Sequence, residues 1–261
     1  MEADEHRIRL TLHYDGSGFA GWQVQPGLRT VQGELEAALL RLTNLPARVI
    51  GAGRTDSGVH ATGQVAGTVV ARTWRADELR RALNGVLPPD IWVESAQTAQ
   101  AAFHARYDAV ARGYVYRVGT ADIARSPFFR RWCWPLVRPL SLELLNDAAA
   151  RFTGAQSFRA FAKTGQPARG ERCRVYRAHW RSWEPAGFSF HVVANRFLHH
   201  MVRYMVGTMV AVARGRRPAA DIDALLGSAA LLVTSPPAPP EGLCLTRIYY
   251  EGDDWAAEDE P

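Results

Sequence analysis

Apolar and polar residues alternate at the start of the chain. Four apolar side chains between residues 8 and 14 alternate with polar ones, which predicts a half-buried strand. The following segment, 15–29, is rich in turn-forming residues, so we expect a loop there. Thr30 then stands at the N-cap of a predicted helix. The apolar positions of that helix are Val31, Leu35, Leu39 and Leu42.

The remaining periodicity predicts further strands and helices in mixed order. Strands are expected at 47–51, 64–70, 91–95, 107–119, 175–183, 187–194 and 243–250. Helices are expected at 79–86, 141–152 and 221–226, and from Asn195 as N-cap to Gly215. Because no regular βαβ rhythm appears, we expect an α+β fold with a mainly antiparallel mixed sheet and flanking helices.

The distribution of charge suggests a polyanionic partner. The 261 residues carry a net charge of +5 and are 47% hydrophobic, which argues against a disordered class. Segment 251–261 holds six acidic residues and no basic one, so residues 1–250 contain 31 basic against 20 acidic side chains. An excess of this size makes nucleic acid the first candidate partner.

Cysteine usage and hydropathy indicate a reduced, cytoplasmic protein. Three cysteines without CxxC spacing argue against a disulfide framework, and the charged opening is unlike a signal peptide. The most apolar stretch, 197–213, carries His199, His200 and Arg203, which fits a buried helix better than a membrane span.

The densest motif is the glycine-rich segment 51–65, GAGRTDSGVHATGQV. Arg54 precedes Asp56 by two residues and is placed to hold that carboxylate ionised and oriented through an ion pair. A carboxylate fixed in this way is plausible as a nucleophile. The segment lacks the Lys-Ser/Thr of a phosphate-binding P-loop. A tight turn in which Asp56 bonds its own backbone amides remains the structural alternative.

Aromatic and basic residues interleave in segment 103–118. Tyr114 and Tyr116 share one face of the expected strand with Val118, while Val115 lies on the other. Such a pattern suits bases stacked beside phosphates, but two half-buried sheet tyrosines would produce it too. The interleaved basic residues are Arg106, Arg112 and Arg117.

Two further clusters allow more than one interpretation. His199 and Arg203 are four residues apart and would share a helix face, but without an HExxH motif a metal site is disfavoured. Arg203 would reach a carboxylate or phosphate at the polar edge of that helix. Segment 169–181 is either a phosphate-tracking stripe or a solvated basic surface. Its arginines, opposed only by Glu171, are Arg169, Arg172, Arg174, Arg177 and Arg181.

Six stretches together resemble the tRNA pseudouridine synthase A family. They lie between residues 14 and 245 in the order of that family, and GRTDxGVH is the most specific motif among them. Departures are Ser57, segment 163–175 and the acidic tail. The stretches are YDGSGFAGWQVQPGLRTVQGELEAAL, AGRTDSGVHATGQV, ALNGVLPPDIWV, FHARYDAVARGYVYR, NRFLHHMVRYMVGT and EGLCL.

The resemblance implies an isomerase that converts uridines at positions 38, 39 and 40 of the tRNA anticodon stem-loop to pseudouridine. It also implies a homodimer that uses neither a metal nor an organic cofactor and does not bind a membrane. The expected fold has two similar subdomains, 1–106 with the Asp loop and 107–250, with a cleft between them. The acidic tail, 251–261, is expected to be disordered.

By motif, the resemblance makes Asp56 the catalytic aspartate and Arg54 its ion-pair partner. Tyr114 would contact the target base, and Arg203 would lie near the cleft. Asp56 would add to the base at C6, attack C1′, or assist loss of the C2′ proton, and these routes stay open. The alternatives are a non-catalytic RNA-binding module on the same scaffold and a hydrolase, the latter disfavoured because glycosidases normally use two carboxylates.

Overall fold

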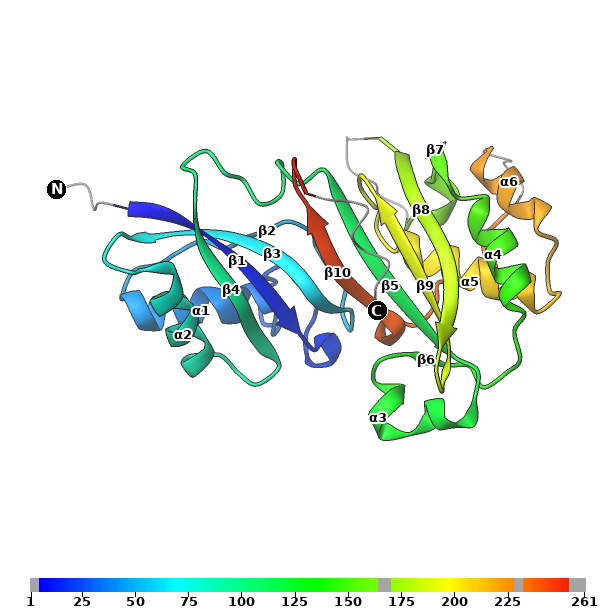
Figure 1. The fold of residues 1–261 in the computed structure, drawn as a ribbon, viewed down its shortest axis with the longest axis horizontal. Helices are drawn as coiled ribbons and strands as arrows, with labels where there is room; N and C mark the ends of the chain where they lie inside the picture. Colours follow the sequence, from blue (N-terminus) through cyan, green and yellow to red (C-terminus); the bar gives the residue numbers. More distant parts are fainter. Residues whose placement is uncertain (1–4, 164–169, 228–231, 254–261) are drawn as a thin grey trace. The chain divides into compact units, whose positions relative to one another are not determined.

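The computed structural model describes residues 5–163, 170–227 and 232–253, and the chain forms two compact units (Figure 1). The first unit comprises Met1–Val110 and Leu245–Pro261, and the second comprises Ala111–Cys244. Strands and helices occur in both, and almost all strand pairs are antiparallel. The predicted α+β class is therefore confirmed. The predicted disorder of the acidic tail falls mostly on 254–261, which lie outside the described residues.

The first unit is a sheet with two helices against one face (Figure 1). Its strands follow the order β4-β1-β3-β10, and β2 pairs with β3. The strands are β1 (Glu5–Tyr14), β2 (Ile50–Gly51), β3 (His60–Ala71), β4 (Ile91–Ala99) and most of β10 (Leu243–Tyr249). The helices are α1 (Val31–Thr43) and α2 (Ala76–Val86), with a 3-10 turn, η1 (Gly16–Gly18).

Local sequence explains how these elements begin and which side they bury. Ile8, Leu10 and Leu12 on β1 are completely buried, whereas the side chains between them are half-exposed, as the alternation predicted. Thr30 caps α1, because its Oγ1 accepts a hydrogen bond from the N–H of Gly33 at 3.3 Å. The predicted strand and helix start are therefore confirmed.

The second unit contains a four-stranded antiparallel path in the order β5-β9-β8-β7, and β6 pairs with β5 in parallel. Its strands are β5 (Ala111–Gly119), β6 (Trp134–Pro135), β7 (Gly154–Ser157), β8 (Arg172–Trp183) and β9 (Gly187–Ala194). Its helices are α3 (Pro127–Arg130), α4 (Leu142–Ala150), α5 (Met201–Ala213) and α6 (Ala220–Leu226). Three 3-10 turns complete it: η2 (Asp122–Arg125), η3 (Arg159–Phe161) and η4 (Pro240–Gly242).

Helix α5 begins five residues later than the sequence predicted. Asn195 was expected to cap it, but Asn195 extends the strand pairing instead. Its N–H donates to the carbonyl of Arg174 at 3.0 Å, and its Oδ1 accepts from the N–H of Arg174 at 2.9 Å. His200 then adopts a left-handed conformation (φ 64°), which no α-helix interior accepts, so the helix begins at Met201.

The described residues also bear on the expectation that the apolar stretch 197–213 forms a buried helix. Most of α5 is buried within the second unit, as expected for an apolar helix that packs into a protein core. Among the described ranges, none of the helices combines the length and apolar character needed to cross a bilayer. All three cysteines are buried and free.

Candidate active site

Asp56 lies in a short loop between β2 and β3, and a buried glutamine fixes the start of that loop. The side-chain amide of Gln64 donates to the carbonyl of Gly53 at 2.8 Å, and its Oε1 accepts from the N–H of Gly53 at 3.2 Å. Gln64 is 0% exposed, so water does not compete for either bond. This reciprocal pair sets the direction in which the chain leaves toward Asp56.

The residue before Asp56 is held from two sides. Thr55 is buried, and its Oγ1 forms a hydrogen bond of 2.8 Å with the hydroxyl of Tyr14 at the end of β1. Its carbonyl accepts from the N–H of Trp22 at 3.0 Å. Gly21 approaches the same carbonyl so closely that a Cβ there would lie 2.7 Å from it. Only glycine fits this position, where φ is also +93°.

A turn follows Asp56 and is anchored to the backbone of Phe19. The N–H of Val59 donates to the carbonyl of Asp56 at 3.2 Å, and Gly58 supplies a positive φ of 79°. The Phe19 carbonyl accepts from the N–H of Gly58 at 3.4 Å and from the Ser57 hydroxyl at 3.2 Å. The backbone is therefore fixed on both sides of Asp56.

Phe19 itself is held by an arginine clamp. The Arg29 guanidinium lies 4.2 Å from the centre of the Phe19 ring. It also donates to both carboxylate oxygens of Asp90, at 2.6 and 2.9 Å, and to Glu34 at 2.7 Å. The hydrogen bond to Asp90 is the main reason that the pKa of Arg29 is raised. This clamp ties segment 15–29 to the start of β4.

The carboxylate of Asp56 is half-exposed, whereas Thr55 before it is buried. Arg54 is exposed, and the part of the chain that the structure describes shows no ion pair between Arg54 and Asp56. Its predicted role as the partner of Asp56 stays a prediction. The geometry is that of a carboxylate held on a rigid support.

In the second unit, Tyr114 lies on the face of the sheet that packs into the core. It is 8% exposed, and its ring meets that of Phe197 edge to face at 5.0 Å. The register pairs Tyr114 with Val192 and Tyr116 with Phe190, so both tyrosines share one face as predicted. Tyr116 is fully buried rather than half-buried.

Arg203 on α5 connects this helix to segment 238–242. Its Nε donates to the carbonyl of Ala238 at 2.7 Å, and the N–H of Ala238 donates back to the Arg203 carbonyl at 2.9 Å. Beside it, the Tyr116 hydroxyl donates to the carbonyl of Pro239 at 2.8 Å. Burial is the main cause that raises the pKa of Tyr116 well above its ordinary value, and the nearby Arg203 cation opposes it. The predicted contact of Arg203 with a phosphate stays a prediction.

The structure corrects the interpretation of the histidine pair. His199 and His200 lie in a turn before α5, with their rings 4.2 Å apart, and not on the helix. His199 and Arg203 therefore do not share a helix face as the i, i+4 spacing predicted. The late start of α5 is the reason, because the helical periodicity does not extend back to residue 199.

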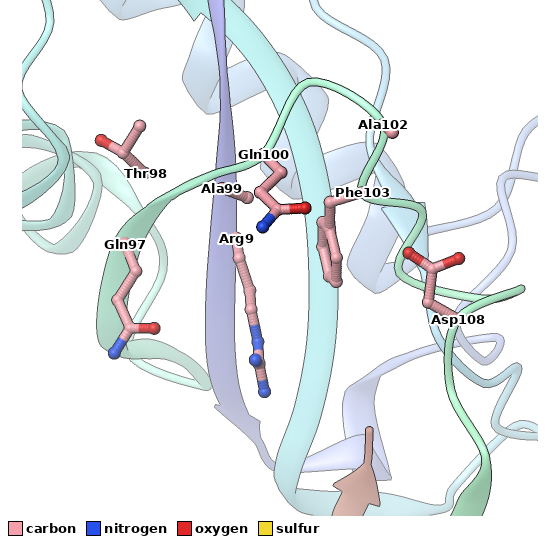
Figure 2. Close-up of a pocket in the computed structure, with 8 residues that line it drawn as sticks. All are labelled: Arg9, Gln97, Thr98, Ala99, Gln100, Ala102, Phe103 and Asp108. Atoms are coloured by element: carbon pink, nitrogen blue, oxygen red, sulfur yellow. The ribbon is translucent and has the colours of Figure 1, made fainter. Parts of the chain in front are cut away.

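A separate hollow lies on the first unit and is lined by the eight residues labelled in Figure 2. Its volume is about 420 Å³, and Arg9 crosses it with its guanidinium 4.4 Å from the ring centre of Tyr250. Arg9 neighbours the buried Leu10 on β1, so the hollow lies on the face opposite to that residue. Neither Asp56 nor Arg54 lines it.

Sequence reasoning missed the residues that hold the Asp56 loop. Tyr14, Trp22 and Gln64 lie within stretches that carry the family resemblance, but none of them has a residue type that signals a support role. Their partners lie 41, 33 and 11 positions away in the chain, which no local pattern reveals.

Comparison with known proteins gives a consistent result. A family model described as "tRNA pseudouridine synthase" matches residues 11–108 and 148–251. A relative from Moorella thermoacetica named "tRNA pseudouridine synthase A" is 41% identical over 93% of this chain and 99% of its own. Relatives with the same name from Geobacillus kaustophilus and Syntrophomonas wolfei are 39% and 36% identical, each over 95% of this chain and over 95% and 98% of their own length.

These matches cover both units and include the Asp56 loop. They define the class as an RNA-modifying isomerase. The chain belongs to the tRNA pseudouridine synthase family, which confirms the resemblance seen in the six sequence stretches.

Proposed function

We propose that this protein converts uridine to pseudouridine at positions 38, 39 and 40 of the tRNA anticodon stem-loop, with Asp56 as the nucleophile. Family membership supports the type of reaction. The observation that carries the residue assignment is the half-exposed carboxylate of Asp56 on a loop whose flanking backbone is anchored on both sides. Such pre-organisation is what a nucleophile needs.

The chemistry is an isomerisation that conserves all atoms. The N1–C1′ bond breaks, the uracil turns, and a C5–C1′ bond forms, while the proton on C5 leaves and N1 gains one. No electrons pass to a carrier. Asp56 acts by addition to C6, by attack on C1′ or by assisting loss of the C2′ proton, and each route requires an ionised carboxylate beside the sugar or base.

The other predicted residues receive supporting roles in this proposal. Tyr114 packs against the uracil face, which its aromatic ring and small exposed edge suit. Arg54 orients Asp56 or a neighbouring phosphate from its exposed position. Arg203 is a positioning residue, because it holds the segment after residue 238 against α5.

The substrate must leave its helical stack before reaction. A uridine in the anticodon stem is paired and stacked, and extruding it costs a few kcal/mol. Contacts between phosphates and the arginine-rich chain offset that cost.

The experiment that tests this proposal is pseudouridine mapping on tRNA incubated with the purified protein alone. We expect new pseudouridines at positions 38 to 40. Bound but chemically unchanged tRNA would overturn the proposal in favour of an RNA-binding module. Release of free uracil would overturn it in favour of a hydrolase.

We also propose that the protein is a homodimer, that it works without a metal or organic cofactor, and that it acts in the cytoplasm. The family resemblance supports these three statements. Sedimentation of the purified protein tests the first, with a mass of twice 28.9 kDa as the expected result. Activity that persists after treatment with a chelator tests the second.

A further inference from the structure

Strand β8 contains a β-bulge that changes which of its side chains share a face. Val175 pairs with Ala194 on β9, but the next pair along the ladder is Arg177 with Val193. Two steps on β8 therefore correspond to one step on β9, which is the signature of a bulge. Without the extra residue, Arg177 would oppose Val192 and point into the core.

Because of the bulge, four arginines of β8 share one face of the sheet, and an arginine of β5 lies on the same face. Arg172 and Arg174 precede it and alternate with the buried Cys173 and Val175. After it, Arg177 and Arg181 pair with Val193 and Ser189, which lie on the same face, and Arg117 on β5 also pairs with Ser189. We name this set the arginine face: Arg117, Arg172, Arg174, Arg177 and Arg181.

Ring geometry confirms which side these residues occupy. His179 and His191, which lie between the arginines in this register, stack with centroids 5.3 Å apart and planes 13° apart. Arg117 lies 5.5 Å from the ring centre of Trp183 at the end of β8. On the opposite side, the Trp180 indole reaches the sulfur of Met209 on α5 at 3.3 Å.

The strands that carry this face are basic. Strands β5, β8 and β9 contain no acidic residue along their whole length, all of which the structure describes. Arg172 and Arg174 are exposed, while the others are half-buried. At about 3.3 Å per residue, the distance from Arg172 to Arg181 is about 30 Å, long enough for several phosphates. Arg169 of the predicted stripe lies outside the described residues.

Tyr114 lies on the other face of the same sheet, because its register partner Val192 is on the side of Trp180 and Phe190. A nucleotide against Tyr114 therefore cannot also contact the arginine face. Resting on the proposed function, we propose that the arginine face binds backbone phosphates of the tRNA body, outside the stem-loop that reacts.

The charge favours RNA over a second copy of this chain as the occupant. Residues 1–250 carry 31 basic and 20 acidic side chains, so a second copy would bring like charge to this face. Guanidinium groups pair with phosphate oxygens bidentately and keep their charge at any physiological pH. Such contacts position an RNA without reading its sequence.

The test compares two triple variants that lose the same charge. The first is Arg172→Gln, Arg174→Gln and Arg181→Gln. The control is Arg80→Gln, Arg81→Gln and Arg125→Gln, which removes arginines that pair with carboxylates of their own helical segments. The affinity for full-length tRNA is measured over about 50–200 mM salt, and kcat/KM is measured on full-length tRNA and on the isolated anticodon stem-loop.

For the first variant, we expect the log–log salt slope to become shallower by about 2–3, since each lost phosphate contact removes about one. The ratio of its kcat/KM on full-length tRNA to its kcat/KM on the stem-loop should fall about tenfold, because KM for full-length tRNA rises. Each single substitution should make the slope shallower by about one. A graded change of this kind separates the loss of phosphate contacts from misfolding. Changes no larger than those of the control would overturn the proposal.

Other outcomes are equally decisive. Equal losses on full-length tRNA and the stem-loop would place these arginines at the reacting stem and contradict the proposal. A change in sedimentation mass for the first variant only would identify a contact between copies instead. Wild-type protein that makes no pseudouridine would refute the proposed function itself, which is a separate result.

Discussion

The backbone on both sides of Asp56 is held in place by contacts with residues distant in the chain. Thr55 is buried before it, and the turn after it is bonded to Phe19. Gly21 presses against the Thr55 carbonyl in a conformation that only glycine adopts easily. At the residue scale, catalysis should therefore respond to substitutions that never touch the substrate.

Gly21→Ala tests that dependence. Its new Cβ would lie 2.7 Å from the Thr55 carbonyl and would displace Asp56. We expect kcat to fall at least about tenfold, because small misplacements of a reacting group are costly. The control is Gly27→Ala, which has a similar positive φ of 72° but nothing within 4 Å. It should lose about 1–2 kcal/mol of stability and keep its activity. Equal activity in both variants would contradict this account of the loop.

The loop residues that could take part in the reaction were predictable from the sequence, but the residues that hold the loop in place were not. Glycine spacing around Arg54 and Asp56 marks a tight connection that presents a carboxylate. Gln64 looks like any polar strand residue until the fold places it opposite Gly53. The arrangement depends on contacts between distant segments, which a single sequence does not display.

At the scale of elements, periodicity predicts where most strands and helices lie and fails where it is interrupted. Strand β9 has the predicted ends, and β1 buries the predicted side. The bulge in β8 and the left-handed His200 before α5 escaped prediction. Each is one irregular residue that changes the face or the start of an element, and neither has a distinctive residue type.

Helix α5 contains a glycine whose packing makes a prediction. A Cβ on Gly207 would lie 2.1 Å from the carbonyl oxygen of Pro236, so the helix and this segment fit only without a side chain. We expect Gly207→Ala to lower the free energy of unfolding by about 1–3 kcal/mol, as overpacking does. Chemical denaturation of the variant and of the wild type measures this difference in the free energy of unfolding.

The matched control is Gly85→Ala on α2, where no atom lies within 4 Å of the new Cβ. There alanine should raise stability by up to about 1 kcal/mol through helix propensity alone. If Gly207→Ala were as stable as Gly85→Ala, the close packing of α5 against Pro236 would be refuted.

At the scale of the whole molecule, charge decides the partner. The net charge of +5 includes a strongly acidic last segment, so the rest of the chain is considerably more basic. We expect the affinity for tRNA to fall steeply with salt, with a log–log slope of about −4 or steeper. Filter binding at several salt concentrations measures the slope, and a value near zero would exclude extensive phosphate contacts.

The central claim is that Asp56 carries out the chemistry, and Asp56→Asn tests it most directly. This change keeps the size of the side chain and removes its charge, while Asp122→Asn on the exposed η2 turn serves as the control. The measurement is tritium release from tRNA that carries 5-tritiated uridine. We predict that Asp56→Asn lowers release at least about a thousandfold while tRNA binding is retained, and that the control matches the wild type. Release at the wild-type rate by Asp56→Asn would contradict the account.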